Sequence, residues 1–447
     1  MQAAHWRGRQ WRVRARRGVL DGVIMACVLG APTPALATNA SYLPGYGSKS
    51  LGLGGGGAAL PQDALTIVTN VAGLAQVPDG VDLGVTLYSP WTRMNVAGNA
   101  QTTDLHWFPA PSFGIKGTLR PDLAWGFSIY GNGGIGNDYE PSPFDRAAGG
   151  GKPTGIDHTD RLSLRMVSLL AVPSLAWQAT PDHAFGAGLL LSYQSFNAKG
   201  LGLFGCFTPE GAKDAACQGG APVPSREPDG LTNNGNAYQF GAGLRVGWLW
   251  HAHPRLSVGV GGSTRIKNTR LHKYDRLLPD KGSLDLPPQA NIGFAFKATD
   301  RLTLLLDYQK TFYEAVAAYS NPGPVLGQAP RREQLLGTDR GFGFGWRDQN
   351  MYKLGMHYRW RDDWVLRAGM NHSPSPIARS QLSFALLNPA IMETTVHVGF
   401  TKTLRNGDEI TMAAFHGFEE RLKGQSLLGP AYVEHYEYGL DFSYHWR

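Results

Sequence analysis

The stretch YEYGLDFSYHW, residues 436–446, decides the fold class, because large apolar or aromatic residues alternate in it with polar or small ones without a break. Successive side chains of a β-strand point to opposite faces, so one face carries Tyr, Tyr, Leu, Phe, Tyr and Trp and the other Glu, Gly, Asp, Ser and His. The alternative is an amphipathic strand that closes a soluble sandwich. The pattern favours an outer-membrane β-barrel, in which aromatic residues gather at the lipid interfaces and the lumen is polar.

The N-terminus has the composition of an export signal. Six arginines lie between positions 7 and 17, followed by an apolar stretch from Val19 to Leu29 and the small-residue pattern of residues 35–37. This order predicts a signal peptide over residues 1–37. Arg16-Arg17 as a twin-arginine signal and Cys27 as a lipoprotein cleavage site are alternatives that match poorly. No other stretch has the roughly 18 unbroken apolar residues of a membrane helix, so strands would have to span the membrane.

Charge and cysteine content narrow the function further. The net charge of +7 falls to +2 once the +5 of the signal peptide is removed, so the basic balance does not indicate nucleic-acid binding. Cys206 and Cys217 remain after export, and an even pair in an exported chain predicts a disulfide in an extracellular loop. Where such a bond forms well it stabilises by about 2–4 kcal/mol. A cysteine-based metal site is not expected, because no second pair supplies the other ligands.

The body of the chain, residues 80–447, consists of strand-like segments that we expect to span about 9–11 residues each. Short turns at residues 180–183, 298–301, 361–363 and 405–408 alternate with long polar connections at residues 137–160, 201–236, 319–347 and 373–388. Tight periplasmic turns and larger external loops are typical of a transmembrane barrel. A soluble β-solenoid would instead show a fixed sequence period. The sequence therefore predicts an all-β protein, a transmembrane antiparallel β-barrel.

Motifs of catalysis are missing from the sequence. It has no G-x-S-x-G nucleophile elbow, no H-E-x-x-H and no carboxylate pair in a setting that singles it out. The glycine run at residues 52–57 is not followed by the Lys-Ser or Lys-Thr of a phosphate-binding loop. We therefore expect no catalytic residues, no metal and no cofactor.

Several motifs resemble one family. Residues 52–75, with Asp63-Ala64 and the stretch Asn70 to Ala75, resemble the N-terminal hatch of the long-chain fatty acid transporter (FadL/TodX, OMPP1-like) family of outer-membrane proteins. In that family an aspartate-alanine pair precedes Asn-Pro-Ala-Gly-Leu, and this chain has Val71 in place of the proline. Further matches follow in the family's order at residues 286–293, 307–308, 345–349, 352–355, 364–369, 375–377 and 396–400.

The resemblance implies a barrel of about 14 strands with its lumen plugged by an N-terminal hatch, residues 38–79. It also implies passive uptake of long-chain fatty acids or other hydrophobic molecules across the outer membrane of a Gram-negative bacterium. The expected partners are a hydrophobic small-molecule substrate, outer-membrane lipid and lipopolysaccharide, with no nucleic acid and with the barrel as a monomer. The alternative is a barrel that acts as an adhesin or a lipid-modifying enzyme through its long external loops. A hatch favours transport, because an adhesin has no need to occlude its lumen.

The family's moving parts map onto two segments. The resemblance assigns Asp63, Asn70, Val71 and Ala72 to the hatch, where we expect them to form the gate. In the family an inward kink of the third strand opens the wall for lateral exit, and Asn132, Gly133 and Gly134 match its place. Glycines in a strand weaken pairing and mark bulges. The alternative is an ordinary glycine-rich strand end beside a loop.

A ligand pocket is expected near the end of the strand that includes Phe196. Recognition of a fatty-acid carboxylate calls for a cation in a mainly apolar pocket. The family has a basic residue close to the position of Lys199, which makes Lys199, Phe196 and Phe204 the candidate ligand-binding residues. The alternative is a solvated lysine at the base of a loop. No second cation matches the family's pocket, which favours an uncharged hydrocarbon over a fatty acid.

Overall fold

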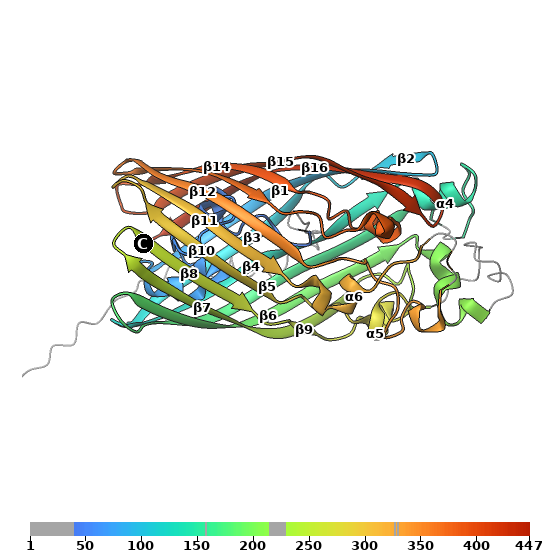
Figure 1. Cartoon of the computed structure of the whole chain (residues 1–447), viewed down its shortest axis with the longest axis horizontal. Helices are drawn as coiled ribbons and strands as arrows, with labels where there is room; N and C mark the ends of the chain where they lie inside the picture. The colour runs from blue at the N-terminus through green and yellow to red at the C-terminus, as the bar shows by residue number, and fades with distance from the viewer. Residues whose placement is uncertain (1–39, 157–158, 214–228, 326–327, 329) are drawn as a thin grey trace, which may run out of the picture. The chain divides into compact units, whose positions relative to one another are not determined.

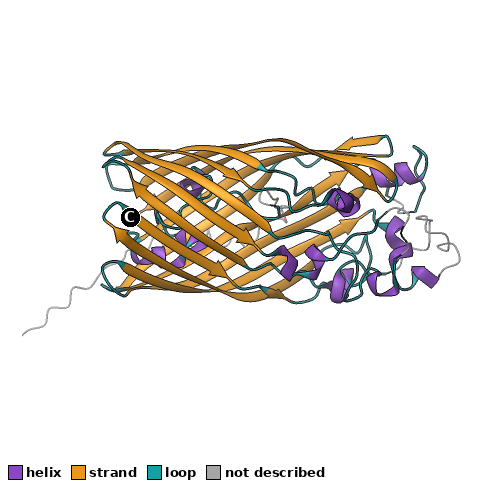
Figure 2. Ribbon diagram, in the orientation of Figure 1, coloured by secondary structure: helices purple, strands orange, loops and turns teal. Residues whose placement is uncertain are grey.

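Fourteen antiparallel strands form a closed barrel in the computed structural model (Figures 1 and 2). The structure describes residues 40–156, 159–213, 229–325, 328 and 330–447. Each strand pairs with the next along the chain, and the last pairs with the first from Val81↔Trp446 to Val96↔Ala431. The barrel strands are β1 (Gly80–Val96), β3 (Phe108–Arg120), β4 (Leu123–Tyr139), β5 (Leu162–Gln178), β6 (His183–Lys199), β7 (Ala237–His253), β8 (Leu256–Ser263), β10 (Gln289–Lys297), β11 (Leu302–Thr311), β12 (Gln349–Arg361), β13 (Trp364–His372), β14 (Thr394–Thr403), β15 (Glu409–Ser426) and β16 (Gly429–Trp446). The predicted barrel of about 14 strands is confirmed.

Two short strands lie beside the barrel strands. β2 (Asn99–Thr102) forms a hairpin with the end of β1, and β9 (Lys267–Asn268) pairs with β7. Seven barrel strands, β1, β4, β5, β6, β7, β15 and β16, have 17 or 18 residues, longer than the expected 9–11. The expectation was too short because pairing continues past the lipid-facing part of the wall at the end with the long loops.

The closing strand has the two faces that its alternation predicts. Glu437 and Asp441 are buried in the interior, and Leu440 and Phe442 are exposed on the outer surface. Other exposed large apolar side chains include Leu175, Trp177, Phe185, Leu244, Val246 and Val398. In the described part of the chain, no helix is long and apolar enough to cross a membrane.

Residues 40–79, called the plug below, lie in the lumen. They include α2 (Ser48–Leu51), α3 (Thr66–Thr69) and the 3₁₀ helix η1 (Val71–Ala75). A Cβ atom at Gly186 of β6 would lie 2.6 Å from the backbone nitrogen of Ala72, and one at Gly259 of β8 would lie 1.9 Å from the Ala58 oxygen. A Cβ atom at Gly52 of the plug would lie 3.3 Å from the Cβ of Arg367 on β13 and 3.4 Å from the Cα of Gly399 on β14. Contacts with strands from several sides of the wall show that the plug fills the interior.

The long connections form a layer at the end of the barrel opposite the short turns, to the right in Figure 1. Their helices are α4 (Pro143–Ala148), η2 (Gly202–Phe207), η3 (Gly211–Lys213), η5 (His272–Tyr274), α5 (Pro279–Gly282), η6 (Tyr313–Ala315), α6 (Ala317–Ser320), η7 (Arg332–Gln334), η8 (Arg379–Gln381) and α7 (Leu382–Ala385). Apolar side chains from these connections and from the adjoining strand ends pack into one large buried cluster, called the apolar cluster below.

Candidate functional site

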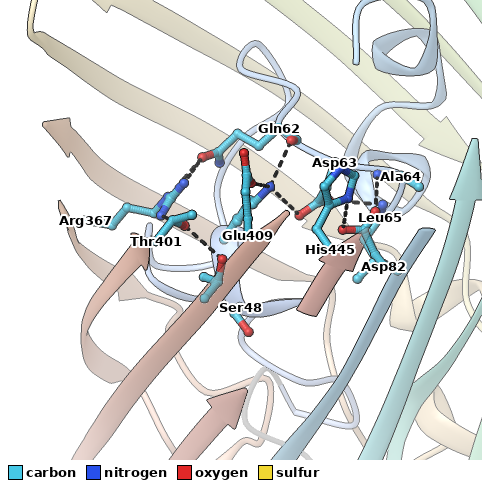
Figure 3. Close-up of polar contacts among 12 residues, drawn as sticks. Ser48, Gln62, Asp63, Ala64, Leu65, Asp82, Arg367, Thr401, Glu409 and His445 are labelled. Carbon is cyan, nitrogen blue, oxygen red and sulfur yellow. Dashed lines mark hydrogen bonds and ion pairs between the residues drawn. The ribbon is translucent and has the colours of Figure 1, made fainter. Parts of the chain in front are cut away.

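A network of buried charges joins the plug to the barrel wall (Figure 3). Lys49 Nζ lies 2.7 Å from Glu409 Oε2 of β15 and 3.9 Å from Asp63 Oδ2, and it donates to the backbone oxygen of Gln62 at 3.2 Å. Asp82 of β1 accepts the backbone N–H of Ala64 at 3.0 Å. Three segments of the sequence thus meet around one lysine.

Two further wall residues complete this network. His445 Nδ1 of β16 lies 2.9 Å from Asp82 Oδ1. Arg367 of β13 donates from two nitrogens to Gln62 Oε1, at 2.9 and 2.8 Å, and from a third to Thr401. Ser48 of the plug also donates to Asp441 of β16. The plug is therefore bonded to β1 and β16, the two strands that close the barrel, and to β13 and β15.

Asp63 is the plug carboxylate in this network. Burial and the negative charge of Asp82 together raise the pKa of Asp63 to about 6, although Lys49 opposes both effects. Asp63 Oδ1 also accepts the backbone N–H of Leu65 at 3.1 Å, which holds the turn before α3. The structure thus places the predicted gate residue Asp63 at the interface between plug and wall, next to Lys49.

A second set of contacts holds the glycine run of the plug. Asp307 Oδ2 of β11 accepts the backbone N–H groups of Gly57 and Ala58 at 2.8 and 2.9 Å. Lys353 Nζ of β12 donates to the Gly55 oxygen at 3.0 Å. Gly57 has a φ of +132°, which side chains rarely adopt, so a glycine is needed there.

Asn70 connects three parts of the structure although its side chain is short. Its Oδ1 accepts the backbone N–H of Ala72 at 3.1 Å and so caps η1, and its Nδ2 donates to the oxygens of Ala58 and Trp248, both at 2.9 Å. Val71 and Ala72 follow it and are fully buried. The four predicted gate residues therefore lie in the plug, but a gating role stays a prediction.

All five buried lysines and arginines of the described residues take part in contacts between the plug and the wall. Besides Lys49, Arg367 and Lys353, Arg245 donates to the oxygens of Ile67 and Val68 at 3.2 and 2.7 Å, and Lys116 lies 2.6 Å from Asp79. These cations are occupied by the plug, so they are not available as ligand-binding cations while it stays docked.

The third strand of the barrel, β4, has a bulge at Asn132. Its pairing with β5 shifts between Gly131↔Leu169 and Gly133↔Ser168, which leaves Asn132 without a partner in the ladder. Gly133 has a φ of +133°, and a Cβ atom there would lie 2.1 Å from the Ser41 oxygen of the plug. Asn132 also accepts a hydrogen bond from the Tyr46 hydroxyl at its backbone oxygen, at 2.8 Å. The bulge therefore brings β4 against the plug.

Next to the bulge, β4 loses its other neighbour. The pairing of β3 with β4 ends at Ser112↔Tyr130, although β4 continues to Tyr139 and the pairing of β3 with β1 continues to Tyr88↔Phe108. Ile135 and Tyr139 lie in the part of β4 that is paired with β5 but no longer with β3, and both are buried in the apolar cluster. Between β3 and β4 the wall thus lacks strand pairing beside the largest apolar region of the interior.

Sequence reasoning missed the contribution of β3 to this unpaired part of the wall. Pro109 and Pro111 lie in the part of β3 that is paired only with β1, and proline has no N–H to donate. Because β3 stays paired with β1 here, the missing donors belong to the edge that faces β4. Two prolines in a short strand segment were the available signal.

The structure brings together only two of the three predicted ligand-binding residues. Phe196 and Phe204 are both buried in the apolar cluster, where Phe196 packs on Tyr274 with ring centroids 4.9 Å apart and Phe204 packs on Phe384 at 5.2 Å. Lys199 is half-buried at the end of β6. It follows Phe196 by three residues, so alternation directs its side chain to the opposite face. The structure does not support Lys199 as a pocket cation beside these rings.

The predicted disulfide falls partly outside the described residues. Cys206 lies in η2, on the side of the long loops, and is disulfide-bonded. Cys217 is not among the described residues, so its pairing with Cys206 stays a prediction.

The fold and the filled lumen define a class of protein, an outer-membrane β-barrel occluded by its own N-terminal segment. A family model described as outer membrane protein transport protein (OMPP1/FadL/TodX) matches residues 37–401. The chain belongs to this family and is a protein of the outer membrane. Members of the family transport hydrophobic substrates and are channels rather than enzymes.

Solved structures show the same fold at low identity. The P. putida toluene transporter TodX has 18% identity and a TM-score of 0.64, with 90% of this chain and 98% of that chain covered. The Ralstonia pickettii toluene transporter TbuX has 18% identity and a TM-score of 0.61, with 91% and 99% covered. A Pseudomonas aeruginosa FadL homologue has 15% identity and a TM-score of 0.65, with 91% and 98% covered. Comparison with curated proteins found no match.

Proposed function

We propose that this protein, acting as a monomer, mediates passive uptake of small uncharged hydrophobic molecules and releases them sideways into the outer membrane. The observation that carries the proposal is the loss of strand pairing between β3 and β4 beside the apolar cluster. The polar lipopolysaccharide leaflet is a barrier to such molecules. An apolar interior offers them roughly 25 cal/mol for each Å² removed from water, which a water-filled pore does not.

The residues at the wall support a lateral exit. Asn132, Gly133 and Gly134 form the part of β4 where pairing with β5 shifts and pairing with β3 has ended. A hydrophobic molecule that leaves the apolar cluster here would enter the bilayer without crossing the polar plug. The plug residues Asp63, Asn70, Val71 and Ala72 would gate this route, because ligand binding favours whichever plug arrangement has the higher affinity.

The choice of an uncharged substrate rests on the buried cations. All five of those described take part in contacts between the plug and the wall, and Lys199 lies on the face of β6 opposite Phe196. A fatty-acid carboxylate would therefore have to compete with the plug for its partner, at the cost of leaving plug oxygens unpaired. The relatives TodX and TbuX are described as toluene transporters, which accords with an uncharged cargo.

Deletion of Asn132 tests the proposal. It removes the extra residue of β4, so that Gly131 and Gly133 become neighbours and pair in turn with Leu169 and Ser168. We expect uptake of labelled toluene by cells to fall to the level of cells that lack the barrel. A substitution at Gly133 is less suitable, because its side chain would also displace the plug.

The matched control is deletion of Ala252. This residue lies at the register shift between His251 and His253 of β7, close to a short turn and away from β3 and β4. Heat-modifiable gel mobility must show that both deletion variants fold. Normal toluene uptake by a folded variant without Asn132 would refute lateral exit at this point.

A further inference from the structure

Three cations gather on the outer surface of the barrel at the end with the long loops. They are Arg93 of β1 and Arg421 and Lys423 of β15, all exposed, and they are called the cationic patch below. β15 and β16 extend farther toward the long loops than β14 (Figure 1), since the pairing of β14 with β15 ends at Thr395↔Gly417 and β15 continues to Ser426. The patch stands on this extension of the wall, outside the lumen.

The strand register brings the patch together. Glu434 of β16 is the direct partner of Arg93 on one side and of Arg421 on the other, and Tyr432 is the partner of Lys423. Arg421 lies 3.1 Å from Glu434, and its guanidinium carbon lies 4.0 Å from the centre of the Tyr432 ring. These four charged side chains sum to +2, so the patch has more positive charge than its own carboxylate can neutralise.

A groove runs beside these side chains. Its lining includes Asn95, Arg421, Lys423 and Tyr432 and contains no carboxylate residue. Glu420 precedes Arg421 but pairs with the buried His435, so alternation directs it to the face opposite Arg421. Glu419 lies in the strand's bulge, between Gly417 and Glu420 and farther from the loop end. Two cations, one amide and an aromatic ring thus face an open groove on the outer wall.

The position of the patch relative to lipid can be derived from β16. From Tyr436 to Trp446 every outward side chain is apolar or aromatic. At ~3.3 Å per residue and a ~40° tilt this interval spans ~25 Å, the height of the apolar band of such barrels. Tyr436 stacks on Trp91 with ring centroids 5.9 Å apart, as expected for an aromatic girdle. The patch begins at the next outward position, Glu434, and therefore lies at the level of the lipid head groups.

We propose that the cationic patch binds the phosphate groups of lipopolysaccharide in the outer leaflet. Guanidinium and ammonium groups form strong charge-assisted hydrogen bonds with phosphate oxygens. The acyl chains of the same molecule would lie below, along the exposed Leu87 and Leu440. The location at the loop end selects lipopolysaccharide over glycerophospholipid, because lipopolysaccharide occupies the outer leaflet.

The test is native mass spectrometry of the full chain in detergent, titrated with bis-phosphorylated lipid A. We expect the triple variant Arg93→Gln, Arg421→Gln and Lys423→Gln to bind lipid A more weakly by about tenfold or more, since each lost cation removes attraction to an anionic lipid. Lipid A stripped of its phosphates should bind the unmodified protein no better than intact lipid A binds the variant.

The control variant is Arg359→Gln, Arg361→Gln and Arg405→Gln, which removes three cations at the end with the short turns. The guanidinium carbon of Arg361 lies 4.4 Å from the centre of the Trp360 ring, so Arg361, like Arg421, is an arginine stacked on an aromatic ring. It lies at the opposite end of the barrel from Arg421. We expect this variant to bind lipid A as the unmodified protein does. Equal loss in both variants, no loss in the patch variant, or tighter binding of phosphatidylglycerol than of lipid A would each overturn the proposal.

Discussion

At the scale of single residues, Asp63 is the buried plug carboxylate on which the contact with the wall centres. It lies among Lys49 of the plug, Asp82 of β1, Arg367 of β13 and Glu409 of β15, with His445 bonded to Asp82. The cations Lys49 and Arg367 offset only part of the cost of ionising Asp63, which comes from its burial and from the repulsion of Asp82. Its proton therefore affects how firmly the plug is held.

We predict that the plug is held more tightly in acid than in base. The pKa of Asp63 is about 6 in the folded protein against an ordinary 3.8, so the folded state binds the proton more strongly. The stabilisation of the docked plug by this proton is complete below about pH 4 and is lost as the pH rises through about 6. Conductance of the purified barrel in a planar bilayer should be higher at pH 8 than at pH 5.

Substitution of Asp63→Asn isolates the contribution of this carboxylate. The amide stays neutral at both pH values, so conductance of the variant should remain low and lose most of its pH dependence. A variant that keeps the full difference between pH 5 and pH 8 would show that another group is responsible.

The sequence could single out Asp63 and Asn70 but not their partners. Gln62 and Arg367, which bond directly, are 305 positions apart, and no local pattern links such residues. Lys199 illustrates the opposite failure. The family's basic residue near this position suggested that Lys199 shares a pocket with Phe196, but an odd spacing on a strand directs the two side chains to opposite faces.

At the scale of elements, the unpaired part of the wall arises from both strands that border it. β4 contributes the bulge at Asn132, and β3 contributes Pro109 and Pro111, which cannot donate to a neighbour. The glycine-rich segment of β4 could be recognised from sequence, because glycine marks irregular strands. The role of the β3 prolines became clear only with the register, because prolines also occur in edge strands that border no opening in a barrel wall.

We predict that the double substitution Pro109→Val and Pro111→Val narrows the gap between β3 and β4. Valine restores two N–H donors and suits a strand that faces lipid, so β3 can extend its pairing along β4. Toluene uptake should fall, though less than on deletion of Asn132, because the bulge remains. Pro173→Val on β5 is the control, since Pro173 is exposed and lies opposite Phe127 in a paired part of β4. An equal effect of the control would assign the change to altered stability.

At the scale of the whole molecule, alternation and the order of short and long connections were enough to predict a barrel, because each strand is a local pattern. The docking of the plug was not predictable in the same way. It depends on polar residues that point inward from strands far apart in the sequence, such as Asp307, Lys353 and Arg367. The barrel is rigid through its ladders, whereas the plug is held mainly by side-chain contacts, so the plug is the part that can rearrange.

A covalent link between plug and wall tests whether that rearrangement is required. A Cβ atom at Gly52 would lie 3.4 Å from the Cα of Gly399 on β14, and one at Gly399 would lie 3.3 Å from the Cα of Gly52, so cysteines at these two positions are close enough to be joined. We predict that Gly52→Cys with Gly399→Cys reduces toluene uptake under oxidising conditions, because a tethered plug loses its alternative arrangement. Uptake should return on addition of a reductant, and each single cysteine variant should transport normally in both conditions. If uptake stays normal while mass spectrometry shows the bond complete, the base of the plug does not move during transport, and the route runs past a plug that remains docked there.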